Sequence, residues 1–505
     1  MIHPQVKMDI DRLWLEFTTG GIVSSLTIIE QISCLIFARL LDMEETRLEN
    51  SRTCPDDAPH HFFRADQQGL RWKNWNTMRD GDAMLALVRD EVFPHLRMLG
   101  GEKYRFGEYM KNVSLQISNP GLLVSAVQQL EKLPLDDREL RGDLYEYLLG
   151  KLTTAGIHGQ FRTPAEVTRL MVELIDPRPS ETIGDPACGT GGLLVEAAEY
   201  LRRTAPQPGE TGEGDTGSGP DGLLQACREP VRQPGFYGLD FDATMLRLAA
   251  MNLMLHGVEN PDLHYMDTLS RAFPEKFPAL ADGDQGGLDV ILSNPPFRGA
   301  MAEEVHPSLL RVVQTRKSEL LFVALALRML RPGGRCAMIV PDGVLCGSSK
   351  AHWAVREQLI DHNRLEAVIA LPSGMFPSFS GLATAILVFT RGGCTENVLF
   401  YDAQADAALQ GEACWKDAAP TLSEPVIQYR RWRSEKCDLT DRTATAFQVP
   451  AVDIRANHFD LSIGRYREIR QQETGYEEPG AILERMRLLE EEIQSDLVEL
   501  GAMLR

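Results

Sequence analysis

The tetrapeptide Asn294-Pro295-Pro296-Phe297 carries residue types that can make a poor nitrogen nucleophile react. An amine on an aromatic ring is unreactive because its lone pair is delocalised into the ring. Two oxygen acceptors on its N–H bonds would localise that pair, and the Asn294 side-chain carbonyl and the Pro295 backbone carbonyl can serve, while the proline rings stiffen the turn. The ring of Phe297 offers a face on which a planar base taken out of its helix can stack. In isolation, a strand-ending turn with a core phenylalanine explains the four residues more simply.

The segment from Asp185 to Gly192, with the sequence DPACGTGG, follows a strand-like run and precedes an apolar helical pattern. Glycines there let the backbone pass close to a ligand at the carboxyl end of a strand, where open α/β sheets bind ligands. The third glycine of the dinucleotide fingerprint is replaced by Leu194, and the Lys-Ser/Thr pair of a phosphate-binding loop is absent from the sequence. The segment alone is a weak signal, because a tight turn would also explain it.

Three aspartates, Asp185, Asp240 and Asp267, are associated with three successive strand-like runs. A carboxylate in the position of Asp240 can accept hydrogen bonds from both hydroxyls of a ribose, and Asp267 is placed to accept one from the exocyclic amine of an adenine. Any one of these acids is more simply explained as a surface or capping residue. Three acids at three strand ends favour a binding site for a cationic ligand such as a sulfonium.

The elements that position these residues are predicted from hydrophobic periodicity. From Thr163 onward, short apolar runs alternate with amphipathic helical patterns, which is typical of a parallel sheet covered by helices, an α/β fold. The expected strands cover residues 181–186, 235–240, 263–267, 288–294, 335–341 and 365–371. The run 382–390 follows after a turn too short for a helical crossover, so we expect it to pair antiparallel.

Three domains are expected along the chain. Residues 1–150 have almost no strand signals and show apolar residues at helical spacing, which predicts an all-helical N-terminal domain. Residues 151–450 would form the catalytic domain. It is interrupted at 204–234 by a Gly/Pro-rich insertion with too few apolar residues to order itself, which we expect to be a mobile surface loop. Residues 451–505 would form a C-terminal extension.

The C-terminal extension ends in a predicted helix with an apolar stripe close to a heptad repeat. The stripe consists of Ile482, Met486, Leu489, Ile493, Leu497, Leu500 and Leu504. Such a stripe requires another helix to cover it. Either the helix folds back on its own domain or it docks on a partner protein, and the pattern is equally compatible with both.

The composition is that of an ordinary globular protein, with 43% hydrophobic and 25% charged residues among 505. The nine cysteines include no Cys-x-x-Cys pair, which favours reduced thiols and a cytoplasmic location. The apolar stretch 21–40 contains Glu30 and Arg39, so we expect a buried helix and not a membrane span. The 72 acidic and 52 basic residues give a net charge of −20. Any binding to nucleic acid must therefore come from local basic patches or from a basic partner.

In combination, these motifs resemble a known family. The ordered set FRTP (residues 161–164), DPACGTGG, Asp240, Asp267 and Asn-Pro-Pro-Phe resembles the amino-group adenine methyltransferases that use S-adenosylmethionine. Nearly the whole chain is similar to the methylation subunit of type I restriction–modification systems (HsdM). The resemblance implies a Rossmann-like S-adenosylmethionine-dependent methyltransferase sheet with a last antiparallel strand. This sheet would be preceded by the helical domain and followed by the C-terminal helix.

The resemblance also implies a role for each candidate residue. The residues implied to bind S-adenosylmethionine are Phe161, Thr163, Asp185, Ala187, Gly189, Gly191, Asp240 and Asp267. The residues implied to act on the target adenine are Asn294, Pro295, Pro296 and Phe297. Phe161 and Thr163 would bound the methionine end of the cofactor, and Asp185 would lie near its amino and carboxyl groups. Many relatives carry tyrosine at the position of Phe161, so a hydroxyl contact is lost there.

The implied reaction is methyl transfer to N6 of an adenine rotated out of double-stranded DNA, without a metal or a covalent nucleophile. The implied partners are the specificity subunit (HsdS) and the restriction subunit (HsdR), and no membrane. One alternative is an enzyme that methylates a glutamine side-chain amide, although the large helical region fits assembly on DNA better. The other is a non-catalytic scaffold of a restriction complex, against which the intact residues 294–297 argue.

Overall fold

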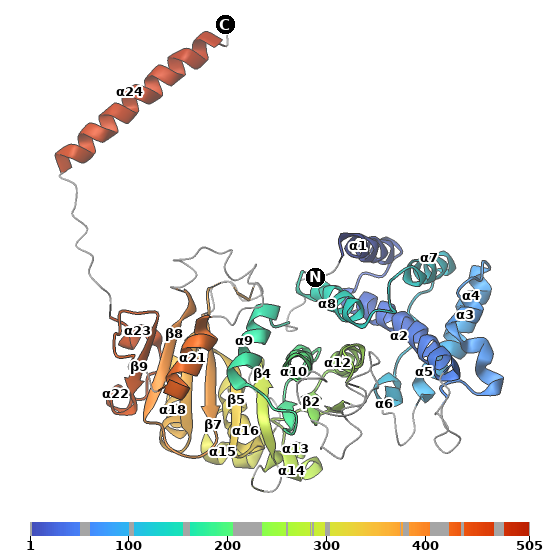
Figure 1. Ribbon diagram of the computed structural model, residues 1–505, viewed down its shortest axis with the longest axis horizontal. Coiled ribbons are helices and arrows are strands. Elements are labelled where there is room, and N and C mark those ends of the chain that lie inside the picture. The colour runs from blue at the N-terminus through green and yellow to red at the C-terminus, as the bar shows by residue number, and fades with distance from the viewer. Residues whose placement is uncertain are drawn as a thin grey trace, which may run out of the picture. The chain divides into compact units, whose positions relative to one another are not determined.

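The computed structural model divides into two compact units, Met1–Tyr466 and Arg467–Arg505 (Figure 1). The structure describes residues 3–50, 61–99, 106–154, 162–205, 235–258, 261–282, 284, 287–297, 304–373, 375–376, 383–404, 424–435, 439–468 and 479–503. The first unit consists of a helical N-terminal region followed by an α/β region. The domain boundaries predicted above stay predictions. The expected insertion lies outside the described residues from position 206 onward.

The N-terminal region is helical, as predicted. Its described α-helices are α1 (Pro4–Thr19), α2 (Ser25–Asn50), α3 (Trp72–Trp75), α4 (Gly81–Leu87), α5 (Phe93–Met98), α6 (Phe106–Met110), α7 (Pro120–Glu131) and α8 (Arg138–Thr154). Ile29, Ile32 and Phe37, which have helical spacing in the sequence, are buried in α2. The same hydrophobic core includes apolar side chains of α12 (Ala243–Leu255), a helix of the α/β region. The two regions therefore pack together through α12.

One sheet forms the centre of the α/β region. Its described strands are β1 (Ile183–Asp185), β2 (Phe236–Asp240), β3 (Asp262–Tyr265), β4 (Leu288–Ser293), β5 (Leu330–Pro341), β6 (Arg364–Ala370), β7 (Thr384–Thr390), β8 (Asn397–Asp402) and β9 (Ala446–Pro450). Among the described residues the strand order is β3-β2-β1-β4-β5-β7-β6-β8-β9. Strands β1 to β5 run parallel to one another, and β7 lies antiparallel between β5 and β6, with Leu387 opposite both Met338 and Val368. The predicted parallel sheet and antiparallel run are confirmed.

β8 and β9 have no counterpart among the strands predicted from the sequence. β8 pairs parallel with β6, and β9 pairs antiparallel with β8 at the edge of the sheet. The resemblance implied that the antiparallel strand β7 would be the last strand of the sheet. In the structure, β8 and β9 follow it along the chain. β9 is five residues long and ends in Pro450, so its sequence carries little strand signal. Pairing with β8, which precedes it by a long stretch of chain, makes this segment a strand.

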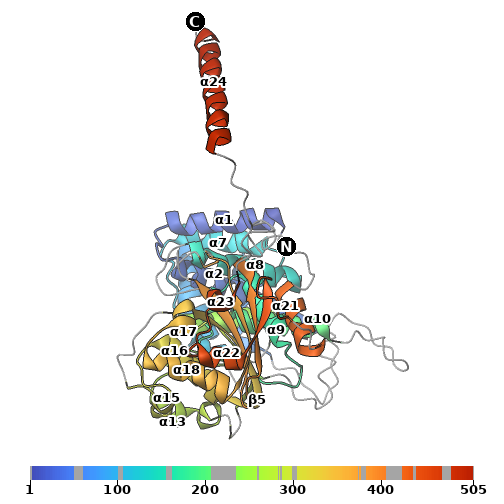
Figure 2. The ribbon, with the colours of Figure 1, turned by 90° about the vertical axis from the view of Figure 1, so that its left-hand side faces the viewer.

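Helices cover both faces of the sheet (Figure 2). One face packs against α9 (Ala165–Ile175), α10 (Gly192–Thr204), α12 and α21 (Glu424–Glu435). The other face packs against α16 (Ser318–Met329), α17 (Asp342–Cys346) and α18 (Lys350–Asp361), with α13 (Ala272–Lys276), α14 (Pro278–Ala281) and α15 (Pro307–Val312) beside them. Two short helices, α22 (Ala451–Ala456) and α23 (Ile463–Tyr466), follow β9. Every residue of β4 and β7 is buried, which explains why the middle of each strand is an uninterrupted apolar run in the sequence.

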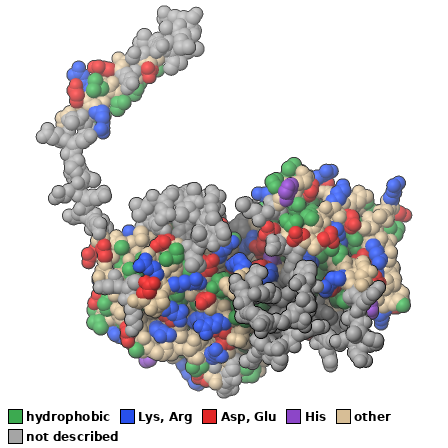
Figure 3. Space-filling model, in the orientation of Figure 1, with side chains coloured by type: hydrophobic (Ala, Val, Ile, Leu, Met, Phe, Trp, Pro, Cys, Tyr) green, Lys and Arg blue, Asp and Glu red, His purple; other side chains and the backbone are tan. Residues whose placement is uncertain are grey.

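The second unit contains the predicted C-terminal helix, α24 (Pro479–Met503). Four stripe residues, Met486, Leu489, Ile493 and Leu497, are between 51% and 63% exposed. Figure 3 shows hydrophobic side chains along α24 beside charged ones. The side chains of Ile482 and Leu500, and the whole of Leu504, lie outside what the structure describes. Within the described ranges, none of the helices combines the length and the apolar character needed to span a bilayer.

Candidate active site

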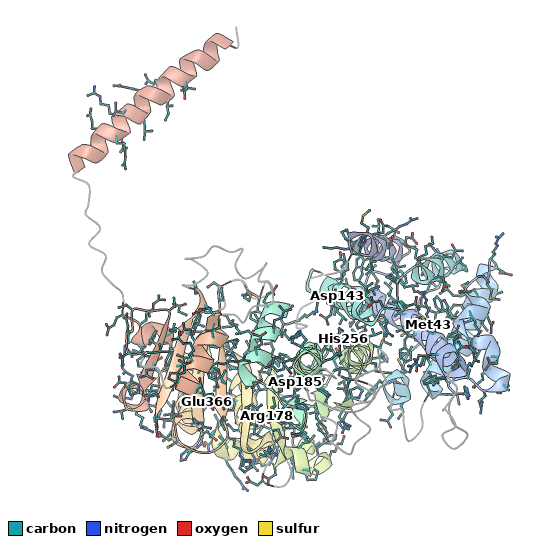
Figure 4. All side chains as sticks on the ribbon, in the orientation of Figure 1. Met43, Asp143, Arg178, Asp185, His256 and Glu366 are labelled. Carbon is teal, nitrogen blue, oxygen red and sulfur yellow. The ribbon has the colours of Figure 1, made fainter. Side chains whose placement is uncertain are left out.

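The candidate residues gather at the carboxyl edge of the parallel strands. Asp185 is the last residue of β1, Asp240 is the last of β2, and Asn294 directly follows β4. Because β1 pairs with both β2 and β4, these three positions are neighbours at one edge of the sheet. Figure 4 places Asp185 inside the α/β region, at the end of β1.

The glycine turn after β1 is held by the two aspartates. The Asp185 carboxylate accepts hydrogen bonds from the Ala187 N–H at 3.0 Å and from the Ser293 hydroxyl at 2.8 Å. The Asp240 carboxylate accepts one from the Gly189 N–H at 2.9 Å. Each acid thus uses one oxygen to shape the backbone of the turn. Ser293, which the sequence analysis does not single out, connects the end of β4 to the same network.

Two glycines of this turn adopt left-handed backbone conformations. Gly189 has φ of +52° and Gly191 has φ of +74°. A Cβ atom on Gly191 would lie 3.2 Å from the Cβ of Ala249 in α12, whereas one on Gly189 would meet no atom of the described residues within 4 Å. Gly191 therefore allows close packing of the turn on α12, and it caps the start of α10. Gly189 faces open space, which a ligand can fill.

The electrostatics of the turn favour a cationic ligand. Asp185 is 2% exposed, and desolvation by burial raises the pKa of its carboxyl to about 7. Burial also raises the pKa of Asp240. The charged neighbours that contribute to these two shifts are themselves acids, Asp240 and Asp242 respectively. Among the described residues, no ion pair compensates Asp185 or Asp240, so a positively charged ligand would favour the ionised form of both carboxyls.

Asp267 lies just beyond β3, half-buried, and its carboxylate accepts a hydrogen bond from the Leu269 N–H at 3.0 Å. The next residue, Thr268, donates its hydroxyl to the carbonyl of Pro186 at 3.1 Å, which ties this segment to the glycine turn. The sequence analysis misses Phe241, which follows Asp240 and is 68% exposed. An aromatic residue directly after a strand-ending acid is the signal that could have indicated it.

Asn294 is oriented by a residue from another part of the chain. Its side-chain Nδ2 donates a hydrogen bond to the hydroxyl of Thr163 at 3.0 Å. Thr163 lies immediately before Pro164, the N-cap residue of α9. The amide nitrogen is thereby engaged, while Oδ1 of Asn294 accepts no hydrogen bond from the described residues. Phe161, the other candidate in this segment, lies outside the described ranges.

Phe297 is placed differently from what the stacking role requires. Its side chain is 5% exposed, and its ring packs edge-to-face on Phe376 with 5.9 Å between the ring centroids and 90° between the planes. The ring belongs to the core between the sheet and one helix layer. Pro295 is buried as well, and Pro296 is partly exposed. A base can therefore stack on Phe297 only if Phe376 moves or the Phe297 ring turns.

The fold and the candidate site together define a Rossmann-like methyltransferase. The defining features are a parallel sheet with an inserted antiparallel strand, a glycine turn after β1, an acid at the end of β2 and Asn-Pro-Pro-Phe after β4. The sequence profile of the family described as N-6 DNA Methylase matches residues 136–474, and that of the HsdM N-terminal domain matches residues 6–130. The chain therefore belongs to the N-6 DNA Methylase family. It is an adenine-specific DNA methyltransferase of the kind that forms modification subunits of type I restriction systems, which confirms the expected family and the expected methylation of adenine.

Named relatives agree with this assignment. The EcoEI methylase subunit of the type I restriction enzyme of Escherichia coli is 29% identical over 92% of this chain and 90% of its own length. The EcoKI methylase subunit of Escherichia coli strain K12 is 30% identical over 66% of this chain and 62% of its own length. Among solved structures, the modification subunit of a putative type I restriction enzyme from Vibrio vulnificus superposes with a TM-score of 0.69 at 25% identity, covering 89% of this chain and 93% of that one.

Proposed function

We propose that the glycine turn binds S-adenosylmethionine and that Asn294 presents the target adenine to it. When bound, S-adenosylmethionine would supply the methyl group as an electrophile on a sulfonium. The buried carboxylates of Asp185 and Asp240 fit a ligand that carries positive charge at the sulfonium and the amino group, because both acids lack a cation among the described residues. The open space at Gly189 leaves room for the methionine part of such a ligand.

The remaining cofactor contacts follow from the positions of the strand ends. Asp240 ends β2 and would accept hydrogen bonds from the ribose, and Asp267 beyond β3 would accept one from the adenine of the cofactor. The exposed ring of Phe241 would cover an adjacent apolar face of the cofactor. Ala187 and Gly191 would contribute through the backbone of the turn and not through side chains.

On the target side, Asn294 and Pro295 would polarise the amine of an adenine taken out of the duplex. Oδ1 of Asn294 and the carbonyl of Pro295 would accept the two N6 hydrogens, which localises the nitrogen lone pair for attack on the methyl carbon. Thr163 keeps Oδ1 directed at the substrate because it engages the amide nitrogen. Phe297 would stack on the base after its contact with Phe376 opens, and Pro296 would keep the turn rigid.

The main support for this proposal is the hydrogen bond from Asn294 to Thr163, at the same edge of the sheet as the carboxylates of Asp185 and Asp240. Its test is the variant Asn294→Ala in the complex with the specificity subunit, assayed for methyl transfer from labelled S-adenosylmethionine to DNA. We expect methyl transfer to be lost while calorimetric binding of S-adenosylmethionine changes less than threefold. Unchanged turnover in Asn294→Ala would exclude the residue from the reaction. A wild-type complex that binds no S-adenosylmethionine would instead favour the non-catalytic scaffold.

We further propose that the partners are double-stranded DNA, a specificity subunit and a restriction subunit. A chain with a net charge of −20 needs a basic partner to supply contacts with DNA phosphates. The exposed stripe of α24, formed by Met486, Leu489, Ile493 and Leu497, offers an apolar face for a helix of the specificity subunit. A cytoplasmic location and the boundaries 1–150, 151–450 and 451–505 belong to the same proposal.

A further inference from the structure

Helix α8 of the N-terminal region packs closely against α12 near the candidate site. A Cβ atom on Gly142 of α8 would lie 2.5 Å from Nε2 of His256, which follows α12, so only a glycine permits this approach. Figure 4 shows Asp143 of α8 near His256. Glu146 comes four residues after Gly142 and hence lies on the same face of α8. This face brings the Glu146 side chain to the α/β region.

The first link from Glu146 leads to the glycine turn. Asn252 of α12 is fully buried, and its Nδ2 donates hydrogen bonds to Oε1 of Glu146 at 3.1 Å and to the backbone carbonyl of Thr190 at 3.0 Å. Thr190 lies between Gly189 and Gly191 in the turn. Since one amide group serves both acceptors, the position of the turn depends on the acceptor that Glu146 provides.

The second link from Glu146 runs through Arg162 to Thr163, the residue that holds the amide of Asn294. The backbone carbonyl of Glu146 accepts a hydrogen bond from Nη1 of Arg162 at 2.8 Å, and its carboxylate forms an ion pair with the same guanidinium. Burial lowers the pKa of Arg162 to about 10, so this poorly hydrated cation depends on its partners in the protein. Arg162 directly precedes Thr163, whose hydroxyl holds the amide of Asn294.

We propose that Glu146 is a positioning residue for methyl transfer, acting through Asn252 on the glycine turn and through Arg162 on the segment that holds Asn294. Its carboxylate and backbone carbonyl fix the position of the glycine turn relative to the segment that holds Asn294. An in-line transfer is sensitive to such alignment, because a displacement of about 1 Å can cost a factor of about 100 in rate. The inference rests on the function proposed above, and it gives helix α8 a part in positioning the reacting groups.

The test compares Glu146→Ala and Glu146→Gln with the wild type, as full-length chains in complex with the specificity subunit. We expect Glu146→Ala to lower kcat for methyl transfer by more than tenfold, because both links are weakened. Glutamine keeps an oxygen acceptor for Asn252 but loses the charge opposite Arg162, so Glu146→Gln should recover part of kcat. Melting temperatures of all variants are measured alongside, and Glu146→Gln preserves the test if the alanine variant does not fold.

A matched control is Glu30→Ala. Glu30 of α2 forms an ion pair with Arg247 of α12 at 2.9 Å, so it too joins the helical region to α12, but no described contact connects this pair to the glycine turn. Its loss should lower the melting temperature by an amount similar to that in Glu146→Ala, with kcat of the folded enzyme kept within twofold. Equal kcat losses in the Glu30 and Glu146 variants would reduce Glu146 to a structural role and overturn the proposal.

A double-mutant cycle between Glu146→Ala and Asn252→Ala tests the first link directly. If the two residues act through one connection, the fold-loss of kcat in the double variant should be smaller than the product of the two single losses, and the part that exceeds the loss in Asn252→Ala alone reports the link through Arg162. Fully additive losses would contradict the link. The proposed function is judged separately by the wild-type complex: failure of wild-type methyl transfer refutes that function, whereas normal wild-type activity with normal Glu146 variants refutes only the positioning role.

Discussion

The side-chain amide of Asn294 donates a hydrogen bond to the hydroxyl of Thr163 over 3.0 Å, although 131 positions separate the two residues in the chain. The bond joins the end of β4 to the segment before α9, and it orients the amide so that Oδ1 is left to accept hydrogen bonds from a substrate.

Replacing Thr163 by valine should remove that hydrogen bond while keeping the shape of the side chain. A net contribution of about 1 kcal/mol for such a bond corresponds to a roughly fivefold loss in the rate of methyl transfer. Thr163→Ser retains the hydroxyl and is the matched control, with a rate expected close to wild type. Single-turnover methylation of DNA measures both. Equal rates for the valine and serine variants would show that the hydroxyl does not orient Asn294 during the reaction.

The raised pKa of Asp185 predicts that binding of a cationic cofactor depends on pH. Since burial places this pKa at about 7, the carboxyl is neutral below pH 7 and ionised above it. Affinity for S-adenosylmethionine should therefore rise as pH increases through 7, with a slope approaching tenfold per pH unit on the acidic side. Calorimetric titrations from pH 5.5 to 8.5 measure this, and Asp185→Asn should bind weakly with a flatter profile. A dissociation constant that is independent of pH in the wild type would contradict the assignment.

The same pKa has the opposite consequence for the stability of the protein without ligand. A carboxyl whose pKa rises from 3.8 when unfolded to about 7 when folded binds its proton more tightly in the native state. Its contribution to stability is therefore complete below about pH 4 and is lost as pH rises to 7, at a cost on the order of 4 kcal/mol. Asp185→Asn removes this loss, so its melting temperature should exceed that of the wild type by more at pH 8 than at pH 4. A constant difference across this pH range would argue that the carboxyl is not buried as described.

Alanine substitutions at Gly189 and Gly191 should lower the free energy of unfolding by different amounts. Both have positive φ, so each substitution costs about 1–2 kcal/mol of backbone strain. Gly191→Ala adds a close contact with Ala249 at 3.2 Å and should be the more destabilising of the two in urea denaturation. Gly189→Ala adds no contact with the residues that the structure describes, so its stability loss should be smaller. It should nevertheless weaken S-adenosylmethionine binding, because its new methyl group enters the proposed cofactor space. Equal stability losses would contradict the close packing at Gly191.

The exposed stripe of α24 should carry binding to the specificity subunit. The double variant Leu489→Glu, Ile493→Glu places two charges on this stripe, and we expect it to abolish co-elution with that subunit in size-exclusion chromatography while S-adenosylmethionine binding is kept. As a control, Arg487→Ala removes an exposed ion pair with Glu491 in the same helix and should leave the complex intact. A stable complex of the double variant would refute docking through this stripe.

The amino-acid sequence by itself determined the class of fold, and it indicated candidate residues for the site. Periodicity is a local property, so apolar runs such as 288–294 and 382–390 predict strands directly, and the helical spacing around Ile29 and Ile32 predicts α2. Asp185, Asp240 and Asn294 could be proposed as neighbours because parallel strands end at one edge of a sheet. The short strand β9 could not, since pairing with a distant segment makes it a strand.

Only the tertiary structure decided which side chains touch. The contact of Asn294 with Thr163 and the two links of Glu146 join residues far apart in the chain, so no local pattern encodes them. The burial of Phe297 against Phe376 is likewise set by the packing of a later segment against the sheet. Spacing along the chain specifies which face or strand end a residue occupies, whereas hydrogen bonds and ring contacts depend on the path of the whole backbone.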